Sequence, residues 1–324
     1  MRAIVVEQPG GPEQMRIGEA PTPEAGRGEV RLKVVAAGVN RADLLQCQGH
    51  YPPPEGASDI IGLEVSGTVD QVGAGVTGWR PGDRAVALLA GGGYAEYAVV
   101  PAEHVAPVPE GVDPATAGGL IEAAATVVSN LAEAGLRPGE TLLVHGGAGG
   151  IGSFAVPYAA RVIGARVLAT AGTAAKTQAC VARGAAAAFD YHGDWAAQVR
   201  EATGGRGPDG ILDIIGAKYL DTHLRLVAPH GRLQIIGLQG GSKGTANLGL
   251  MLDNWLTING TGLRSRDRAA KARIVAEVVR TVWPAYASGA VPLPEVMRYP
   301  LERAAEAHRA LAAGATTGKL VLTL

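Results

Sequence analysis

The sequence predicts a two-domain α/β protein, with a mainly β region followed by a parallel, doubly wound sheet. At 324 residues the chain exceeds the usual size of a single hydrophobic core. Up to about residue 120, short alternating β-branched segments are separated by turns such as Pro81–Asp83 and Gly91–Gly93. From Pro114 onward, short apolar segments alternate with helical patterns, which is typical of a parallel sheet covered by helices on both faces.

Within the first region we expect a compact antiparallel barrel or sandwich. Its strands are predicted at residues 31–40, 63–73, 83–88 and 94–101. After residue 261 the pattern predicts a long charged helix over Asp267–Ala287, a further helix and a closing strand. Because a terminal strand needs a sheet to pair with, we expect this tail to return to the first domain.

Composition favours neither nucleic acid nor a membrane as a partner. The formal net charge of −1 gives no electrostatic reason to expect nucleic acid or an anionic membrane surface. The N-terminus lacks the apolar core of a signal peptide, and no apolar run approaches the roughly 18–20 residues that span a membrane. Cys47 and Cys180 lie far apart without a CxxC pattern. We therefore expect a reduced, soluble, cytoplasmic protein.

A glycine-rich turn follows the apolar segment Leu142–Val144 and precedes a helical pattern. Its spacing matches the dinucleotide-binding fingerprint in two registers, in which glycines permit a tight turn and bring backbone N–H groups close to a pyrophosphate. The candidate cofactor residues here are Gly146, Gly147, Gly149, Gly150, Ile151 and Gly152. In a chain with 47 glycines the match is weak alone, and the strand and helix around it strengthen it. Pro157 is expected to kink that helix.

The second strand of such a domain discriminates between the two nicotinamide cofactors. In NAD-binding proteins an acidic residue at its end binds the ribose 2′-hydroxyl. Here the strand ends at Ala171 and Gly172 without a carboxylate, and Thr173 and Lys176 follow within one helical turn. The pattern favours NADPH, with Thr173 and Lys176 near its 2′-phosphate, although Lys176 alone could equally be a solvated helix residue.

The chain resembles the zinc-free quinone oxidoreductase, or zeta-crystallin-like, branch of the medium-chain dehydrogenase/reductase superfamily. The matching segments cover essentially the whole chain: GVNRADLLQCQGHYPPP, GLEVSGTVDQVG, GGGYAEYAV, HGGAGGIGS, LRSRD and GKLVLTL. The resemblance implies a GroES-like barrel domain at 1–122, a Rossmann NADPH-binding domain at 123–261 and a return to the catalytic domain at 262–324. It also implies a homodimer through the edge strand Trp255–Leu263.

The resemblance also assigns site residues. Asn40, Tyr51 and Thr126 are expected near the nicotinamide and the acceptor, although Asn40 could only cap a turn and Tyr51 could only pack. Asp43 is expected to cap the helix that follows Asn40. The remaining expected cofactor contacts are Tyr191, near the 2′-phosphate, Gly237, Leu238, Leu263 and Arg264 around the nicotinamide, and Arg264 or Arg266 on the pyrophosphate, with surface salt bridges as their alternative.

Zinc-dependent members of the superfamily carry ligands that this chain lacks. This chain has Asn40 at the position of their cysteine ligand and Leu63 at the position of their histidine ligand. Their third ligand typically corresponds to a position near Glu122 of this chain. We therefore expect no metal site. Without a Lewis acid to stabilise an alkoxide, the expected acceptor is already electron-poor, such as a quinone or an activated enone.

Two departures from close relatives bear on specificity. Alanines at 124 and 125 replace a bulky residue, which suggests a roomier cleft or a different substrate. An arginine that some relatives use for the 2′-phosphate is replaced in the segment Ala313–Ala315, so that phosphate recognition would depend more on Lys176.

The leading hypothesis is an NADPH-dependent quinone oxidoreductase that transfers hydride in a cleft between its two domains. An enoyl or enone reductase of the same superfamily is the first alternative. A cofactor-binding structural or RNA-binding crystallin-like protein is the second, although the near-neutral charge and the absence of a basic-aromatic stripe argue against nucleic acid.

Overall fold

The computed structural model describes residues 1–314 and 316–324, so the sequence comparison at Ala315 lies outside the described residues. The chain forms two compact units. The first comprises residues 1–125, 263–287 and 294–324, and the second comprises residues 126–262 with 288–293.

A seven-stranded sheet organises the first unit, in the order β14-β15-β3-β4-β5-β7 with β6 also paired to β3. All of its pairs are antiparallel except β14 with β15, and β1 and β2 form a separate hairpin. The strands of this unit are β1 (Arg2–Val6), β2 (Met15–Glu19), β3 (Glu29–Val39), β4 (Glu64–Val72), β5 (Arg84–Leu88), β6 (Tyr97–Pro101), β7 (Val105–Pro107), β14 (Val296–Pro300) and β15 (Lys319–Thr323). Its helices are α1 (Arg41–Cys47), α2 (Pro114–Ala117), α9 (Arg268–Ala287) and α10 (Ala304–Ala312), and the first turn of α3 (Ile121–Glu133) also belongs to it.

The long strand β3 shows why this sheet forms. Val30, Leu32 and Val34 are buried in the core, whereas Lys33 between them is exposed, as the period of two in a strand requires. Bulges at Arg31/Leu32 and Val34/Ala36 shift its register against β4. The closing strand β15 pairs with the other end of β3, so the end of the chain completes this barrel-like sheet.

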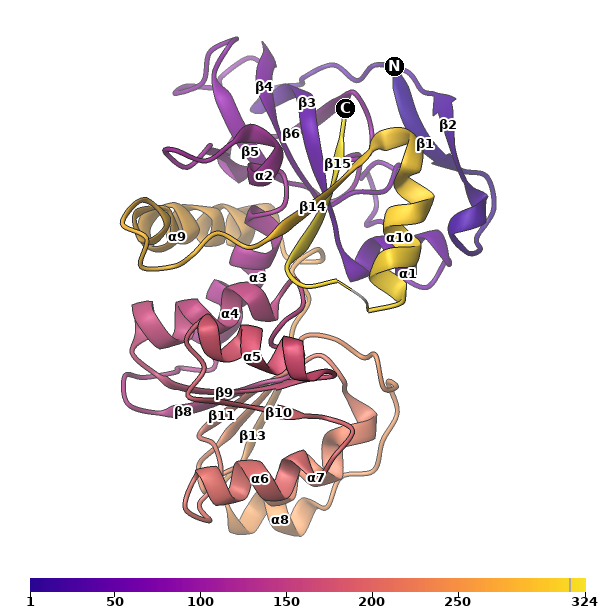
Figure 1. Cartoon of the computed structure of the whole chain (residues 1–324). Coiled ribbons are helices and arrows are strands. Elements are labelled where there is room, and N and C mark those ends of the chain that lie inside the picture. Colours follow the sequence, from indigo (N-terminus) through magenta and orange to yellow (C-terminus); the bar gives the residue numbers. More distant parts are fainter. Residues whose placement is uncertain (315) are drawn as a thin grey trace. The chain divides into compact units, whose positions relative to one another are not determined.

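The second unit is a doubly wound Rossmann domain. Its six strands are all parallel in the order β10-β9-β8-β11-β12-β13, the 3-2-1-4-5-6 arrangement of dinucleotide-binding folds. They are β8 (Thr141–Val144), β9 (Arg166–Ala171), β10 (Ala187–Asp190), β11 (Gly210–Asp213), β12 (Arg232–Ile235) and β13 (Thr257–Gly260). Figure 1 shows α4 (Gly152–Tyr158) and α5 (Ala174–Ala182) on one face and α6 (Trp195–Ala202), α7 (Leu220–Leu226) and α8 (Leu248–Asp253) on the other.

Two helices that the sequence predicts are present in the structure. The helix containing Pro157 is α-helical only to Tyr158 and continues as a π-helix over Ala159–Ile163, the kind of local irregularity that a proline induces. The predicted long charged helix is α9, which ends at Ala287 as expected. None of the helices within the described residues is long and apolar enough to cross a membrane.

Candidate functional site

The glycine-rich turn lies at the carboxyl end of β8. Gly146 has a φ of +67°, which favours glycine, and the Gly149 N–H donates to its carbonyl oxygen over 3.0 Å. A Cβ on Gly152 would lie 2.3 Å from the Gly146 oxygen and 2.4 Å from the Gly147 Cα, so the start of α4 sits directly against the turn. Since β8 and β11 are neighbours where the strand order reverses, the turn stands at the switch point at which such sheets bind ligands.

The end of β9 brings together residues that the sequence assigned to the 2′-phosphate. A Cβ on Gly172 would lie 2.3 Å from the Tyr191 hydroxyl oxygen, so the phenol of Tyr191 lies against the Gly172 backbone. Thr173 is the N-cap of α5, and its hydroxyl accepts the Lys176 backbone N–H over 3.3 Å. Gly172, Thr173 and Tyr191 are therefore adjacent, with Lys176 in the first turn of the helix that starts there.

Gly237 and Leu238 follow β12 at the same end of the sheet. A Cβ on Gly237 would lie 3.0 Å from the carbonyl oxygen of Ile214, which itself follows β11. Leu238 is largely exposed, and a Cβ on Gly216 would lie 2.9 Å from its Cδ2. The structure thus places this pair beside the loop after β11, whereas Leu263 and Arg264 belong to the first unit.

Thr126 begins the part of α3 that belongs to the second unit, and it is buried. Its carbonyl oxygen accepts the side-chain amide of Asn130 over 2.7 Å. The Asn130 oxygen in turn accepts from Gln234 of β12 and from the hydroxyl of Thr261, each over 2.6 Å. Sequence reasoning missed this network, which fastens α3 to the sheet.

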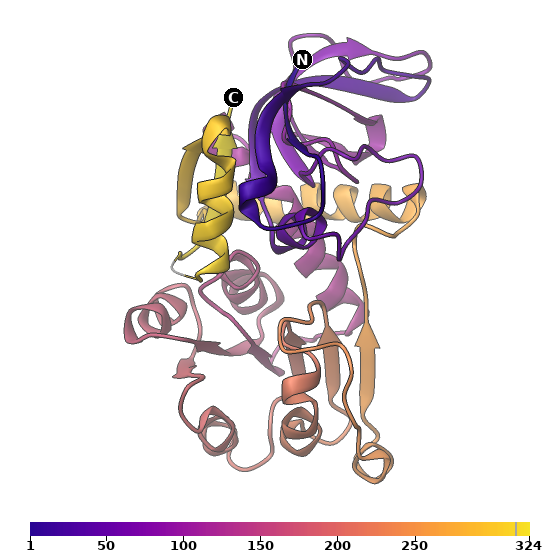
Figure 2. The same ribbon diagram turned by 90° about the vertical axis from the view of Figure 1, so that its right-hand side faces the viewer.

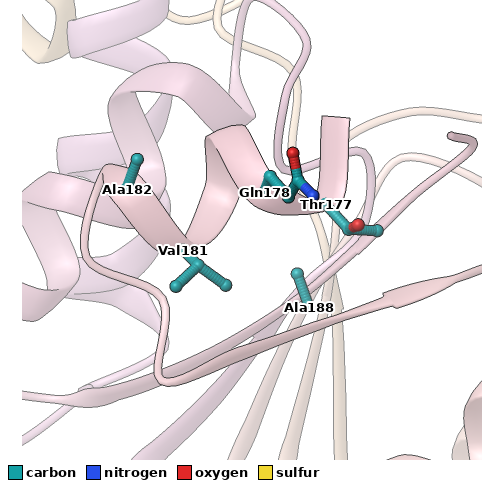
Figure 3. A pocket seen from close by; sticks show the side chains of 5 residues that line it. All are labelled: Thr177, Gln178, Val181, Ala182 and Ala188. Atoms are coloured by element: carbon teal, nitrogen blue, oxygen red, sulfur yellow. The ribbon is translucent and has the colours of Figure 1, made fainter. Parts of the chain in front are cut away.

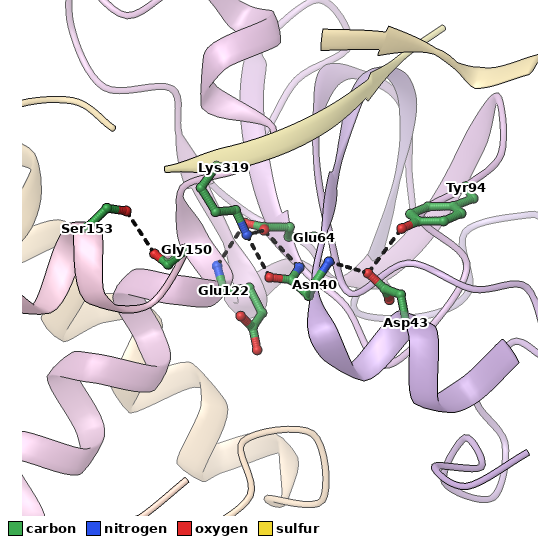
Figure 4. A network of polar contacts seen from close by, with 8 residues as sticks. All are labelled: Asn40, Asp43, Glu64, Tyr94, Glu122, Gly150, Ser153 and Lys319. Atoms are coloured by element: carbon green, nitrogen blue, oxygen red, sulfur yellow. Dashed lines mark hydrogen bonds and ion pairs between the residues drawn. The ribbon is translucent and has the colours of Figure 1, made fainter. Parts of the chain in front are cut away.

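Asn40 lies at the end of β3 within a buried ionic network (Figure 4). Its side-chain oxygen accepts from the Lys319 ammonium over 2.6 Å, and its amide nitrogen donates to Glu64 Oε1 over 3.0 Å. Lys319 also pairs with Glu64 over 2.7 Å, and the Glu122 backbone N–H donates to Glu64 Oε2. The Asn40 amide is therefore held in one orientation by β4 and β15.

The Lys319–Glu64 pair was not singled out from the sequence. The two side chains are only 3% and 0% exposed, and an ion pair this deeply buried is held only by excellent geometry and additional hydrogen bonds. The sequence did carry a signal for this pair. Glu64 precedes the buried Val65 and Lys319 precedes the buried Leu320, so each charged residue begins an otherwise largely apolar strand. Their partnership was not visible because it joins β4 to the last strand of the chain.

These residues do not form a zinc donor set. Leu63 is buried and carries no donor atom, and the Asn40 oxygen and one Glu64 oxygen already accept from an ammonium group. A divalent cation at this point would face the positive charge of Lys319.

Asp43 caps α1, as predicted, because its carboxylate accepts the Asn40 N–H over 2.7 Å. The same oxygen accepts from the Tyr94 hydroxyl, which also contacts His308 Nε2 at 3.1 Å. Burial raises the pKa of Asp43 to about 7 and lowers the pKa of His308 to about 4. This chain of buried groups links α1 to α10, which the structure also packs together.

A second buried polar cluster lies beneath the glycine turn. His145 Nδ1 contacts the Thr170 hydroxyl at 2.9 Å, its Nε2 contacts His223 Nε2 at 2.8 Å, and Asp213 lies 3.8 Å from His223 Nδ1. Burial lowers the pKa of His223 to about 3 and the pKa of His145 well below its ordinary value, so both imidazoles are neutral at pH 7.

Potential ligand atoms of His145, Asp213 and His223 lie within 4.8 Å of one another. The two facing imidazole nitrogens are nevertheless at hydrogen-bonding distance from each other, which leaves no space for an ion between them. Asp213 already accepts the backbone N–H groups of Ile215 and Gly216. We interpret His145, Thr170 and His223 as a hydrogen-bonded brace that joins the end of β8 to β9 and α7, with Asp213 of β11 beside it.

Tyr51 lies in the loop after α1, half-buried, and burial raises its pKa. The guanidinium carbon of Arg264 lies 5.2 Å from the centre of the Tyr51 ring. The structure thus brings together two residues to which the sequence gave separate roles.

An open hollow on the second unit does not coincide with these residues (Figure 3). It measures about 380 Å³ and is lined by side chains of α5 and β10: Thr177, Gln178, Val181, Ala182 and Ala188. The lining carries no charged group, so the hollow offers no ion pair to a phosphate.

Two family models match the chain. Residues 26–110 match the alcohol dehydrogenase GroES-like domain, and residues 150–278 match the zinc-binding dehydrogenase family. Among curated proteins, the phthioceranic/hydroxyphthioceranic acid synthase of Mycobacterium tuberculosis is 35% identical over 303 residues. That match covers 92% of this chain and 14% of the synthase, so the chain spans only about one seventh of the relative's length.

Solved structures match over the whole chain. Escherichia coli quinone oxidoreductase complexed with NADPH has a TM-score of 0.90 at 28% identity, with all of both chains covered. A mycobacterial protein complexed with NADPH has a TM-score of 0.89 at 33% identity, and an NAD-dependent alcohol dehydrogenase has a TM-score of 0.87 at 32% identity, again with full coverage of both chains.

The GroES-like sheet, the Rossmann domain and these matches together define the class of protein. The chain belongs to the medium-chain dehydrogenase/reductase superfamily, in the branch that contains the quinone oxidoreductases.

Proposed function

We propose that this protein is an NADPH-dependent reductase whose acceptor is a quinone. NADPH supplies a hydride when bound, and with one proton from solution or the protein the two-electron product is the hydroquinone. The contribution of the protein is to bind the cofactor, orient the acceptor and donate hydrogen bonds to the oxygen on which negative charge develops.

The observation that carries this proposal is the Lys319–Glu64–Asn40 network. The Lys319 ammonium group occupies oxygens that a metal would need, which argues against a Lewis acid here to stabilise the alkoxide of an alcohol substrate. An electron-poor acceptor needs no such stabilisation. Donors such as the Tyr51 hydroxyl suffice for the weaker charge on a quinone oxygen.

The proposed phosphate contacts support NADPH over NADH. The end of β9 offers Gly172 and Thr173 in place of a carboxylate, with the Tyr191 phenol against the Gly172 backbone. A 2′-phosphate at this position would meet hydroxyl groups and the Lys176 ammonium rather than a repelling acid. Two similar structures contain NADPH, whereas one similar protein is described as an NAD-dependent alcohol dehydrogenase. The relatives therefore differ in which nicotinamide cofactor they use.

The direct experiment follows NADPH and NADH oxidation against ortho-quinones, para-quinones, simple enones and an alcohol with the oxidised cofactor. We expect quinone turnover with NADPH and none with the alcohol. Alcohol oxidation at a comparable rate would contradict the proposal, and turnover with NADH far above NADPH would contradict the cofactor assignment.

An enoyl or enone reductase is the second candidate. It is favoured by the synthase relatives, within which a segment of 303 residues matches this chain. A catalytic efficiency for enoyl thioesters well above that for any quinone would favour this candidate. The same Asn40 and Tyr51 geometry would then orient a conjugated carbonyl group.

Replacing Lys176 distinguishes a side chain that binds the 2′-phosphate from a solvated helix residue. If the ammonium binds the 2′-phosphate, Lys176→Ala should raise the KM for NADPH by about tenfold or more, because a hydrogen bond to a charged group contributes roughly 1.5–3 kcal/mol. The KM for NADH should change by less than twofold. Equal changes for both cofactors in steady-state kinetics would contradict the assignment.

We also propose a homodimer through β13. This strand is the edge of the parallel sheet (Figure 2), and an uncovered edge is prone to pair with another chain. In α8 and the turn that leads into β13, Leu248, Leu252 and Trp255 are 72%, 78% and 66% exposed, which is unusual for three large apolar side chains so near in sequence.

Sedimentation velocity at micromolar concentration should therefore show a dimer. Leu252→Glu should shift the protein toward the monomer, because it places a charge in the apolar contact. The matched control is Val181→Glu on α5, which is also exposed but far along the sheet order from β13, and should remain dimeric. A monomeric wild-type protein would contradict the proposal.

A further inference from the structure

Arg264 is buried, and its guanidinium group donates to three oxygen atoms of its own unit. Only 5% of the residue is exposed. Its Nε donates to the Ala90 oxygen over 2.8 Å, its Nη1 to the Tyr51 oxygen over 3.0 Å and its Nη2 to Gln46 Oε1 over 2.8 Å. One guanidinium group therefore connects α1, the loop after α1 and the segment after β5.

The contact with Gln46 extends to the far end of the Tyr51 loop. Gln46 uses its oxygen to accept from Arg264, and its Nε2 donates to the Asp59 carbonyl oxygen over 3.0 Å. The loop from Tyr51 to Asp59 is thus held at one end by Arg264 directly and at the other end through Gln46. Its Pro52–Pro54 run has no backbone N–H groups to donate, so these side chains supply bonds that the loop backbone cannot make.

Arg264 is itself held in place. The Lys271 ammonium of α9 donates to the Arg264 carbonyl oxygen over 2.6 Å and is also buried. Burial lowers the pKa of both side chains, and the guanidinium stays charged because its intrinsic pKa is so high. The planar fork of arginine suits three acceptors in different directions, whereas a lysine ammonium is a point charge on a flexible stem.

From this geometry we infer that Arg264 is a positioning residue, which fixes the loop Tyr51–Asp59 so that the Tyr51 phenol faces the electron-poor carbonyl acceptor. The guanidinium supports the Tyr51 ring through a cation–π contact and the Tyr51 backbone through a hydrogen bond. This inference rests on the proposed reductase function, and it assigns the side chain of Arg264 to acceptor orientation rather than to the pyrophosphate.

The test compares Arg264→Lys with Arg268→Lys. Arg268 is an exposed arginine four residues further along the chain, and its guanidinium makes a forked contact with Glu103 rather than with the Tyr51 loop. We expect Arg264→Lys to lower kcat/KM for the acceptor by about tenfold or more while the KM for NADPH stays within twofold. Arg268→Lys should leave both constants unchanged. A selective rise in the KM for NADPH would instead show a pyrophosphate ligand and overturn the inference.

A double-mutant cycle shows whether Arg264 acts through Tyr51. In a Tyr51→Phe background, Arg264→Lys should change kcat/KM for the acceptor by less than about twofold, because the phenol it orients is already absent. Full additivity of the two losses would overturn the inference.

Hydrogen–deuterium exchange provides a readout that does not need turnover. Amide exchange over residues 51–59 should rise in Arg264→Lys and not in Arg268→Lys, whereas segments that contact neither arginine should be unaffected in both. Unchanged exchange would overturn the inference even if the enzyme is active. If exchange over residues 51–59 rises in Arg264→Lys but the wild-type protein reduces no quinone or enone, the result would support the restraint of the loop by Arg264. It would then be the proposed function that is contradicted.

Discussion

Gly152→Ala is expected to lower NADPH affinity by roughly 100-fold or more, with little turnover left at ordinary cofactor concentrations. The added Cβ would lie 2.3 Å from the Gly146 oxygen and 2.6 Å from the Gly147 carbonyl carbon, and these are backbone atoms that no rotamer change can move aside. The turn must open to relieve the contact, so its backbone N–H groups would no longer point toward the proposed position of the pyrophosphate. Two lost hydrogen bonds to a charged group, at roughly 1.5–3 kcal/mol each, account for that magnitude.

Titration calorimetry with NADPH measures this effect directly. The matched control is Gly193→Ala, where the nearest atom to the added Cβ is 3.6 Å away, and its affinity should equal that of the wild type. If Gly152→Ala bound NADPH within threefold of the wild type, the turn would not be the phosphate cradle.

Lys319→Met is expected to destabilise the first unit by about 3–5 kcal/mol, the range found when one partner of a buried ion pair is removed. The methionine leaves the Glu64 carboxylate fully buried and without the ammonium, while the Asn40 amide and the Glu122 N–H still donate to it. The cost arises from an uncompensated charge, so it should fall when that charge is also removed.

Urea denaturation of three variants tests this explanation. Glu64→Gln combined with Lys319→Met should recover much of the loss, because a neutral amide still accepts from Asn40. Lys33→Met on β3 changes an exposed lysine of the same sheet and should cost less than about 0.5 kcal/mol. A loss below about 1 kcal/mol for Lys319→Met would show that Glu64 is not held as a buried carboxylate.

Much of the fold could be predicted from local patterns. Alternation along β3, the apolar segments β8 and β11 and the glycine turn after β8 each depend on residues that are near in sequence. The absence of an acid at the end of β9 is likewise a local property, and so is the capping of α1 by Asp43. Such features are readable because helix and strand periods and turn conformations depend on neighbouring residues.

The tertiary structure decided which side chains meet. Glu64 and Lys319 are 255 residues apart, His145 and His223 are 78 apart, and Arg264 and Gln46 are 218 apart. The sequence by itself determined the two-domain α/β class and the location of the proposed phosphate turn. Only the folded chain decided that an ammonium group binds Asn40 and that Arg264 supports Tyr51, because partners for buried charges are found across strands and loops that no local pattern relates.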